Sequence, residues 1–350
     1  MRPDDLETLT ELRSATTAVL TEAIGHGATV ALLDAPNQRN VGDSLIWAGE
    51  LEYFRTLGLR LAYVADRRTY DAAELRRALP PDGVILIHGG GNFGDLWDGH
   101  QQHREQVARD FPDRKIVQLP QSVWFESPEK AALANAVLGG HPDFTLLVRD
   151  SESEGRAAAQ LPDVRRRYCW DMALGWSAPT RASAAAPGAA PVLVIARTDH
   201  EGSSGLGDLD LADEIGAEVH VADWTSAELD TLSWRLARLV PRVAHKYRFV
   251  RGPLLRPLVN ASFRWINAAN IRGGIRLYRD RRYAIVDRLH AHVLAVLLDL
   301  DHVLLDNNYG KLGAVYRDYS SRFSTASYAD RPQQAVELAA EALGRARAVR

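Results

Sequence analysis

The chain has 350 residues, 46% of them hydrophobic and 25% charged, which is the composition of a globular protein with a sizeable buried core. A formal charge of -3 argues against a general nucleic-acid binder, and the single cysteine, Cys169, excludes an intramolecular disulfide framework. The first residues lack the pattern of a secretory signal, and no apolar run approaches the roughly 20 residues of a membrane span. We therefore expect a cytoplasmic protein, soluble or peripheral to a membrane.

Predicted strands and helices alternate along residues 1–178. After a helix over residues 6–24, strands are expected at residues 28–35, 59–66, 83–91, 114–120 and 143–150. The segments between them have helical length and periodicity, at residues 44–58, 71–79, 101–111 and 128–138. Because strands joined by crossover helices pair in parallel, we predict a doubly wound α/β domain.

Small residues and prolines replace this pattern in the middle of the chain, so residues 179–190 are predicted to form a linker. Strands are expected again at residues 191–198, 217–224, 282–288 and 302–307, with helices near residues 226–239 and 290–298. The predicted fold class is therefore α/β, with two doubly wound parallel-sheet (Rossmann-like) domains that face a cleft. The second domain spans residues 191–332, and a helix within residues 333–350 is expected to pack back on the first domain.

Two turns of the first domain carry candidate binding residues. Residues 40–49, NVGDSLIWAG, follow a strand and enter a helix, where ligands bind in open α/β sheets. Asp43 either caps that helix or meets a sugar hydroxyl. Residues 88–97, HGGGNFGDLW, contain three successive glycines that permit close backbone approach, and they match neither a P-loop nor a dinucleotide fingerprint. The alternatives are a plain tight turn and a saccharide or phosphate pocket.

The second domain offers polar residues at three predicted strand ends. Arg197 follows one strand, and Arg288 and His290 stand where another strand becomes a helix. At such a place an arginine binds an anion and a histidine exchanges a proton. Asn307 follows a third strand, and His292 lies close to His290 in sequence. An ion pair within the domain and a structural histidine are the alternative interpretations.

A strongly basic stretch covers residues 235–288, with 14 Lys or Arg against Asp280 and Asp287. Aromatic residues such as Phe263 and Trp265 are interleaved with these charges. The pattern favours either a surface attracted to anionic lipid headgroups or a solvated basic face, and it favours nucleic acid less because the rest of the chain is acidic.

Seven blocks at these positions resemble those of the polysaccharide pyruvyl transferase family and occur in the family's order. They are NVGDSLIWAGE, ILIHGGGNFGDLW, QLPQSVWF, VRDSES, ARTDHE, DRLHAH and LLDNNYGK. Ala291 stands where many relatives have glycine. The resemblance implies a two-domain architecture like that of GT-B glycosyltransferases, with phosphoenolpyruvate as donor and a saccharide, lipid-linked in our prediction, as acceptor. The implied product is a cyclic pyruvate ketal, commonly across O4 and O6 of a hexose.

The resemblance also implies where each substrate binds. The predicted donor site comprises Arg197, Arg288, Leu289, His292 and Asn307. The predicted acceptor site lies in the first domain and comprises Asn40, Asp43, Gly90, Gly91, Asn92, Asp95 and Trp97. Arginines neutralise the carboxylate and phosphate of the donor. His290 is the predicted acid, because imidazole ordinarily titrates near neutral pH, and Asp43 and Asp95 are the candidate bases.

This reaction needs no redox cofactor, and the sequence shows no convincing metal-ligand cluster. Two other functions fit the same fold: a GT-B glycosyltransferase that uses a nucleotide sugar, and a noncatalytic two-lobed carbohydrate-binding protein. We predict activity in cell-surface or exopolysaccharide biosynthesis, with the protein peripheral at the inner face of the cell membrane through residues 235–288.

Overall fold

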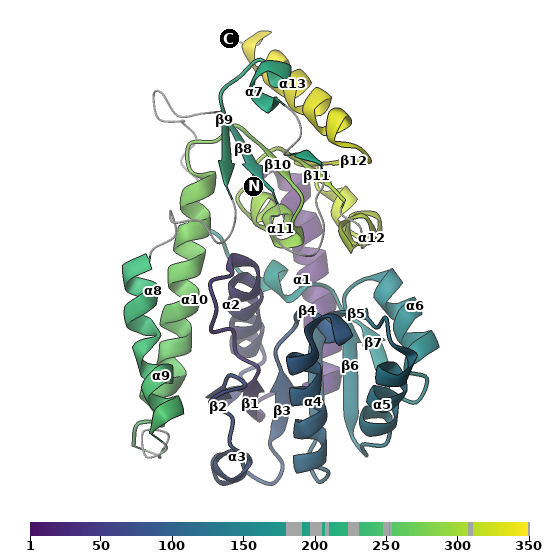
Figure 1. Cartoon of the computed structure of the whole chain (residues 1–350), viewed down its shortest axis with the longest axis vertical. Coiled ribbons are helices and arrows are strands. Elements are labelled where there is room, and N and C mark those ends of the chain that lie inside the picture. The colour runs from purple at the N-terminus through teal and green to yellow at the C-terminus, as the bar shows by residue number, and fades with distance from the viewer. Residues whose placement is uncertain are drawn as a thin grey trace.

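Two all-parallel β-sheets form the framework of the chain in the computed structural model (Figure 1). The structure describes residues 1–179, 191–196, 205–206, 210–222, 231–247, 252, 254–306 and 311–348. We call the parts built on the first and second sheets the first and second lobes. The two sheets confirm the predicted α/β class with two Rossmann-like halves.

The first sheet has the strand order β2-β1-β3-β5-β6-β7, and β4 follows β3 and pairs with β5. Its strands are β1 (Thr29–Leu33), β2 (Arg60–Ala65), β3 (Val84–Ile87), β4 (Gly90–Gly94), β5 (Ile116–Trp124), β6 (Phe144–Val148) and β7 (Arg166–Tyr168). Its helices are α1 (Pro3–Ile24), α2 (Val41–Thr56), α3 (Ala72–Ala78), α4 (Asp98–Asp110), α5 (Pro128–Gly139) and α6 (Ser151–Gln160).

The second sheet has the order β12-β11-β10-β8-β9. Its strands are β8 (Val192–Ile195), β9 (Val219–Ala222), β10 (Tyr283–Val286), β11 (His302–Leu305) and β12 (Ala326–Ala329). The helices of this half of the chain are α7 (Leu211–Ile215), α8 (Thr231–Ala237), α9 (Leu239–Lys246), α10 (Arg256–Tyr278), α11 (Leu289–Leu297), α12 (Lys311–Asp318) and α13 (Pro332–Ala348). The strand β12 and the long helix α10 were not predicted from the sequence.

The central strands are continuous apolar runs because helices cover both faces of each sheet. The segments VILI of β3 and FTLLV of β6 are buried at every position. Each run ends abruptly in polar residues: His88 follows β3 and Arg149 follows β6. All these strands are parallel, so their polar ends gather at one edge of the sheet.

Each sheet reverses its winding direction once, and ligands of open α/β sheets bind at such a switch point. In the first sheet the reversal lies between β1 and β3, and in the second it lies between β8 and β10. The turn after β10 contacts the first lobe, so the carboxyl edges of the two sheets face each other.

The predicted boundary at residues 179–190 separates the strands of the two sheets in sequence. It does not separate the helices, because a helix from the second half of the chain packs on the first lobe. The helix α10 packs against α2 and β2 of the first lobe. Its Asn267 accepts a hydrogen bond from the Ser44 hydroxyl at 2.8 Å. Trp47 of α2 is buried against Phe263 of α10. A hydrophobic core therefore runs from one lobe into the other.

The C-terminal helix corrects another expectation. We expected it to return to the first domain, but α13 packs against α7, β10, β11 and β12. Its Ala335, Val336 and Ala339 share a buried cluster with Ile285 and Val303. The second sheet has an apolar face in this position, and α13 covers it.

Candidate active site

A polar pocket of about 170 Å³ opens at the switch point of the first sheet. Its walls come from the loops after β1, β2 and β3, the start of α2, the helix α4 and the junction of α8 and α9. The lining residues are Asp34, Ala35, Pro36, Asn37, Gln38, Asp43, Asp66, Arg67, Arg68, His88, Asn92, His100 and Arg238. Carboxylates, amides and imidazoles dominate this list, which suits a ligand rich in hydroxyl groups.

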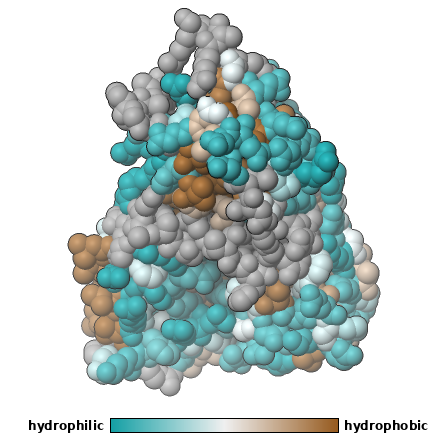
Figure 2. Space-filling view, turned by 45° about the horizontal axis from the view of Figure 1, so that its top comes forward, coloured by the Kyte–Doolittle hydropathy of each residue, from teal (hydrophilic) through white to brown (hydrophobic). Residues whose placement is uncertain are grey.

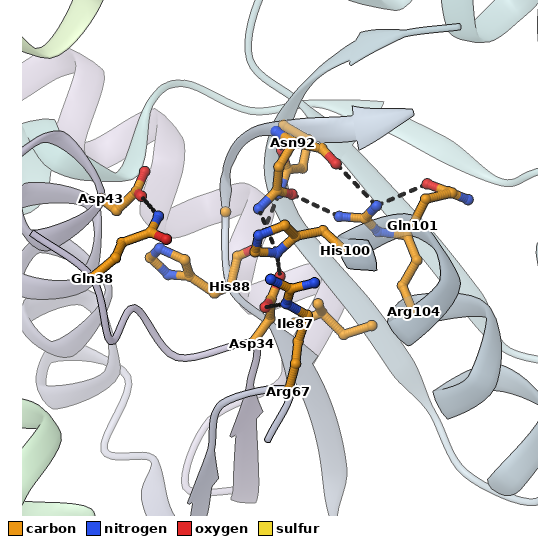
Figure 3. Close-up of polar contacts among 12 residues, drawn as sticks. Asp34, Gln38, Asp43, Arg67, Ile87, His88, Asn92, His100, Gln101 and Arg104 are labelled. Atoms are coloured by element: carbon orange, nitrogen blue, oxygen red, sulfur yellow. Dashed lines mark hydrogen bonds and ion pairs between the residues drawn. The ribbon is translucent and has the colours of Figure 1, made fainter. Parts of the chain in front are cut away.

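His88 and Glu50 form a buried pair at this pocket. Nδ1 of His88 lies 2.9 and 3.0 Å from the two carboxylate oxygens of Glu50, which also accepts the N–H of Gly89. Nε2 of His88 is buried and has no hydrogen-bond partner among the described residues, and Figure 3 shows the ring beside Gln38 and Asp43. Burial alone would lower the pKa of His88, but the charge and hydrogen bond of Glu50 raise it above its ordinary value.

A second polar group lines the opposite side of the pocket (Figure 3). Nδ1 of His100 lies 2.6 Å from Asp34 and 3.2 Å from the Asn92 amide. Burial would raise the pKa of Asp34, but the hydrogen bond and charge of His100 lower it below its ordinary value. The buried Arg104 donates to the Asn92 side-chain oxygen at 2.7 Å and so fixes the orientation of the amide.

Asn40, rather than Asp43, caps the helix α2. The Asn40 side-chain oxygen accepts the N–H of Gly42 at 2.8 Å, and its amide donates to Oδ2 of Asp43 at 2.9 Å. Gln38 donates to the same oxygen at 2.7 Å. The capping role considered for Asp43 is therefore wrong, and its carboxylate lines the pocket instead.

His290 reaches across from the second lobe into a cluster of first-lobe residues. Its Nε2 lies 3.3 Å from Asp171 and 3.4 Å from Nη1 of Arg149, which donates to Asp171 at 2.7 Å. Burial would raise the pKa of Asp171, but His290 and Arg149 hold it well below its ordinary value. Asp171 is therefore a buried carboxylate that favours its ionised form and contacts both Arg149 and His290. Nε of Arg149 also donates to Ser122 at 3.0 Å.

Two glycines allow this cluster to approach the pocket. A Cβ on Gly42 would lie 2.8 Å from Nδ1 of His290, so a side chain at residue 42 would displace the imidazole. Gly90 has φ +137°, which L side chains rarely adopt, and a Cβ there would lie 4.0 Å from Oδ1 of Asp43. The loop of three glycines thus passes between Asp43 and Arg149, which lies beside Gly91.

The helix α11 begins at the switch point of the second sheet. Arg288 is at its N-cap position, Leu289 is its first residue and His290 is its second. The positive end of this helix thus begins at an arginine, whose side chain cannot accept hydrogen bonds from the first helical amides. The predicted donor residues Arg197 and Asn307 lie outside the described residues.

Three predicted site residues lie elsewhere. Oδ1 of Asp95 accepts the backbone N–H of Glu126, and Oδ2 accepts that of Ser127, so Asp95 fixes a loop and does not line the pocket. Trp97 is exposed outside the pocket. His292 is fully buried, with Nδ1 2.7 Å from His302. The assignments of Asp95 as a base and His292 as a donor ligand are not supported, because both side chains are engaged in hydrogen bonds within the protein.

The polysaccharide pyruvyl transferase family model matches residues 40–309 of this chain. That span begins at the Asn40 cap and includes Arg149, Asp171 and His290. The chain belongs to the polysaccharide pyruvyl transferase family.

Named relatives agree with this family. Pyruvyl transferase 1 of Schizosaccharomyces pombe is 32% identical over 80% of this chain and 66% of its own length. This chain thus spans about two thirds of that relative. A Bacillus subtilis protein provisionally named pyruvyl transferase EpsO is 28% identical over 83% of this chain and 85% of its own length. A crystal structure of an uncharacterised Klebsiella pneumoniae protein has the same fold, with a TM-score of 0.51 and 16% identity over 94% of this chain and 99% of that one.

Several residues of this family member were missed by sequence reasoning. Arg149 lies in VRDSES, a block used only for the resemblance, and His88 opens the glycine-rich block. Glu50 ends the block NVGDSLIWAGE but was not named as a site residue, and Asp171 lay in no block. The one sequence signal for Asp171 as a site residue is its position shortly after a strand. Its partner His290 is 119 positions away, so no local pattern links the two.

Proposed function

We propose that this protein transfers the enolpyruvyl group of phosphoenolpyruvate to a hexose of a lipid-linked saccharide and closes a cyclic pyruvate ketal, as a step in cell-surface or exopolysaccharide biosynthesis. One observation carries the proposal: His290 of a family motif contacts Arg149 and Asp171 beside a polar pocket that suits hydroxyl groups. The reactive centre of the donor is placed between the lobes, and the saccharide enters the pocket of the first lobe.

The donor is a small trianion, and the start of α11 offers the matching charge. The helix end, Arg288 and Arg149 supply backbone donors and two guanidinium groups for its phosphate and carboxylate. Asp171 keeps Arg149 and His290 in fixed orientations. We include Arg197 in this anion site on the basis of its sequence motif alone.

The acceptor is deprotonated from the opposite side. His88 holds its Nδ1 toward Glu50, so its Nε2 is the ring nitrogen that receives a hydroxyl proton. Asp43 lies beside it and accepts a hydrogen bond from a second sugar hydroxyl. This arrangement separates the acid on the second lobe from the base on the first.

The chemistry balances with these groups. His290 gives a proton to the methylene carbon of phosphoenolpyruvate, which leaves the neighbouring carbon oxocarbenium-like. One sugar hydroxyl attacks that carbon and loses its proton to His88. The carbon–oxygen bond to phosphate then breaks, and the second hydroxyl attacks the same carbon and gives its proton to His290, which restores the acid. The proton held by His88 leaves with the phosphate, which restores the base. The products are the ketal and inorganic phosphate, and no electron is exchanged with a redox partner.

Donor binding tests the proposal against the two alternatives. Phosphoenolpyruvate should raise the melting temperature, whereas a glycosyltransferase would respond to a nucleotide sugar and a carbohydrate-binding protein to neither. Mass spectrometry of glycans incubated with phosphoenolpyruvate should then detect the ketal adduct. Stabilisation by a nucleotide sugar without any adduct would overturn the proposal.

The anion site has its own test. Replacing Arg288 or Arg197 by Ala should weaken phosphoenolpyruvate binding, and Lys should restore it only in part because an ammonium lacks the bidentate fork. Calorimetry with Arg55→Ala, a change at an exposed surface arginine, provides the control. Unchanged donor affinity in both Ala variants would reject this anion site.

A further inference from the structure

Nine of the fourteen exposed large apolar side chains among the described residues fall within residues 232–265. This segment includes α8, α9 and the first half of α10. On the flank of the first lobe, α8 and α9 follow one another along α10 (Figure 1). Leu254 is 95% exposed and Leu232 is 70% exposed. Clustered exposure of this kind marks an interaction surface.

The apolar side chains form a row along α8 and α9. Its members are Leu232, Leu236, Leu239, Val243 and Tyr247, spaced by four, three, four and four residues. That spacing places them on one side of a helix. Arg238, between α8 and α9, keeps a helical backbone with φ -72° and ψ -11°, so the row is continuous.

A row of basic side chains runs along α8 and α9 next to the apolar row. Arg235, Arg242 and Lys246 each precede a member of the apolar row by one position, and all three are exposed. Leu258 and Trp265 extend the apolar surface on α10. The exposed Arg272 and Arg276 follow Trp265 by about two and three helical turns. Figure 2 shows the apolar patches projecting from the side of the molecule where Figure 1 places α8 and α9.

The charge of this surface decides between possible occupants. Residues 231–247 and 254–278 contain no Asp or Glu. A second copy of the same surface would place cations against cations, whereas an anionic bilayer complements both the charges and the apolar row. No helix among the described residues is long and apolar enough to cross a membrane. We propose that α8, α9 and the start of α10 form an interfacial binding surface for anionic phospholipid bilayers.

This surface adjoins the pocket, so the inference extends the proposed function and rests on it for the identity of the acceptor. Arg238 lines the pocket and donates from Nε to Asn37 at 2.9 Å. The helices that lie on lipid therefore also form a wall of the acceptor site. A saccharide on a lipid carrier can enter the pocket while its lipid stays in the bilayer.

Only some of the basic residues in the stretch 235–288 can contact lipid. Arg256 is buried and pairs with Glu74 at 2.6 Å, so it is not part of the lipid surface. Arg248 and Arg251 lie outside the described residues. The exposed cations of α8 and α9 are therefore the ones to change.

Vesicle co-sedimentation of the full chain tests the proposal. Wild type should bind phosphatidylglycerol-containing vesicles at low salt, and high salt or pure phosphatidylcholine should reduce binding. Two triple variants should each bind at least about tenfold more weakly, since both apolar insertion and charge contribute. They are Leu232→Ser, Leu236→Ser, Val243→Ser and, separately, Arg235→Ser, Arg242→Ser, Lys246→Ser.

Matched controls lie elsewhere on the surface: Leu6→Ser with Leu133→Ser, and Arg55→Ser with Arg165→Ser. They should bind vesicles like wild type. Absence of wild-type binding at low salt, or equal loss in the controls, would overturn the proposal. So would a wild-type dimer in sedimentation velocity that the leucine variant dissociates without any vesicle binding, because the surface would then serve self-association.

Activity separates this inference from the proposed function. Both triple variants should retain pyruvyl transfer to a short water-soluble saccharide and lose rate only on a vesicle-embedded acceptor. Vesicle binding without any transfer would leave the lipid surface standing and refute the transferase proposal. Pyruvyl transfer without vesicle binding would support the transferase proposal and refute the lipid surface.

Discussion

His290 and His88 approach the pocket region from opposite lobes, and each is oriented by a buried carboxylate. Asp171 lies 3.3 Å from Nε2 of His290, and Glu50 lies 2.9 Å from Nδ1 of His88. A buried carboxylate fixes the ring orientation and the tautomer of its histidine. The two side chains therefore have fixed, separate positions, which suit the acid and base roles proposed for them.

Replacing His290 by Ala should abolish turnover while phosphoenolpyruvate still binds. A proton donor stabilises the transition state more than the bound ground state, and its loss typically reduces the rate by ~10²- to 10⁴-fold. Steady-state rates and donor calorimetry measure the two effects. His26→Ala, at an exposed site on the loop after α1, should behave like wild type. Wild-type turnover in a folded His290→Ala protein would refute the assignment.

Glu50→Gln should shift the acidic limb of the pH profile to lower pH. The pKa of His88 is raised by Glu50 against the opposing effect of burial, and the charges of Asp43 and Asp34 also raise it. Removing the Glu50 charge leaves burial dominant, so His88 loses its proton at a lower pH and is available as a base there. The measurement is kcat/KM for the acceptor against pH. An unmoved limb would show that another group is the base.

The same shift predicts a change in stability with a defined sign. Because the folded pKa of His88 lies above its ordinary value of 6.5, its pair with Glu50 stabilises the fold fully below that pH. This contribution is lost as pH rises through the raised, folded pKa. The melting-temperature difference between wild type and His88→Gln should therefore be larger at acidic than at alkaline pH. The opposite trend would contradict the raised pKa.

At the scale of elements, the first turn of α2 contacts the first turn of α11. Asn40 satisfies the first amides of α2, which leaves Asp43 for the pocket, and Gly42 leaves room for His290. The local sequence of α2 therefore serves a contact with a helix nearly 250 residues later. This contact explains why a glycine stands in the first turn of a helix, where it lowers helix propensity.

Gly42→Ala should lower kcat strongly with a smaller effect on folding. The new methyl group would lie 2.8 Å from Nδ1 of His290, so the imidazole must move away from Asp171. Gly155→Ala in the helix α6 is the matched control, because a Cβ there would have no described atom within 4 Å. That change should stabilise the protein by roughly 0.5–1 kcal/mol and leave kcat unchanged. Equal kinetics for the two variants would argue against the contact.

At the scale of the whole molecule, α10 links the lobes. It belongs to the second half of the chain, yet it packs on α2 and β2 of the first lobe. Arg256 near its start pairs with Glu74 of α3 and lies 4.4 Å above the Tyr63 ring. This docking holds the helices of the proposed lipid surface and the wall of the pocket in one body.

Glu74→Gln should destabilise the fold by about 3–5 kcal/mol, because it leaves the buried Arg256 guanidinium without its counter-charge. Glu52→Gln, which breaks the exposed pair with Arg55, should change stability by only about 0–1 kcal/mol. Denaturant unfolding measures both. A similar small effect for the two substitutions would mean that the Glu74 pair does not hold α10 in place.

The sequence by itself determined the class of the fold and the positions of its turns. Apolar runs such as VILI before His88, and the glycines after it, are local patterns that reflect burial on both faces and tight backbone turns. The predicted strand at residues 282–288 likewise placed Arg288 and His290 at a strand end, where the structure has the start of α11.

Only the tertiary structure decided which of these residues meet. His290 contacts Asp171 and Arg149 because sheet order and lobe packing bring three distant segments together, and no short-range pattern encodes that distance. The same holds for Glu50 and His88, which are 38 positions apart, and for the placement of α10 and α13. His292 and Asp95 looked equivalent to the site residues in sequence, but burial against His302 and the backbone of residues 126–127 gives them structural roles. Side-chain partners depend on three-dimensional packing, whereas hydrophobic periodicity is set by each element's own exposure to the core.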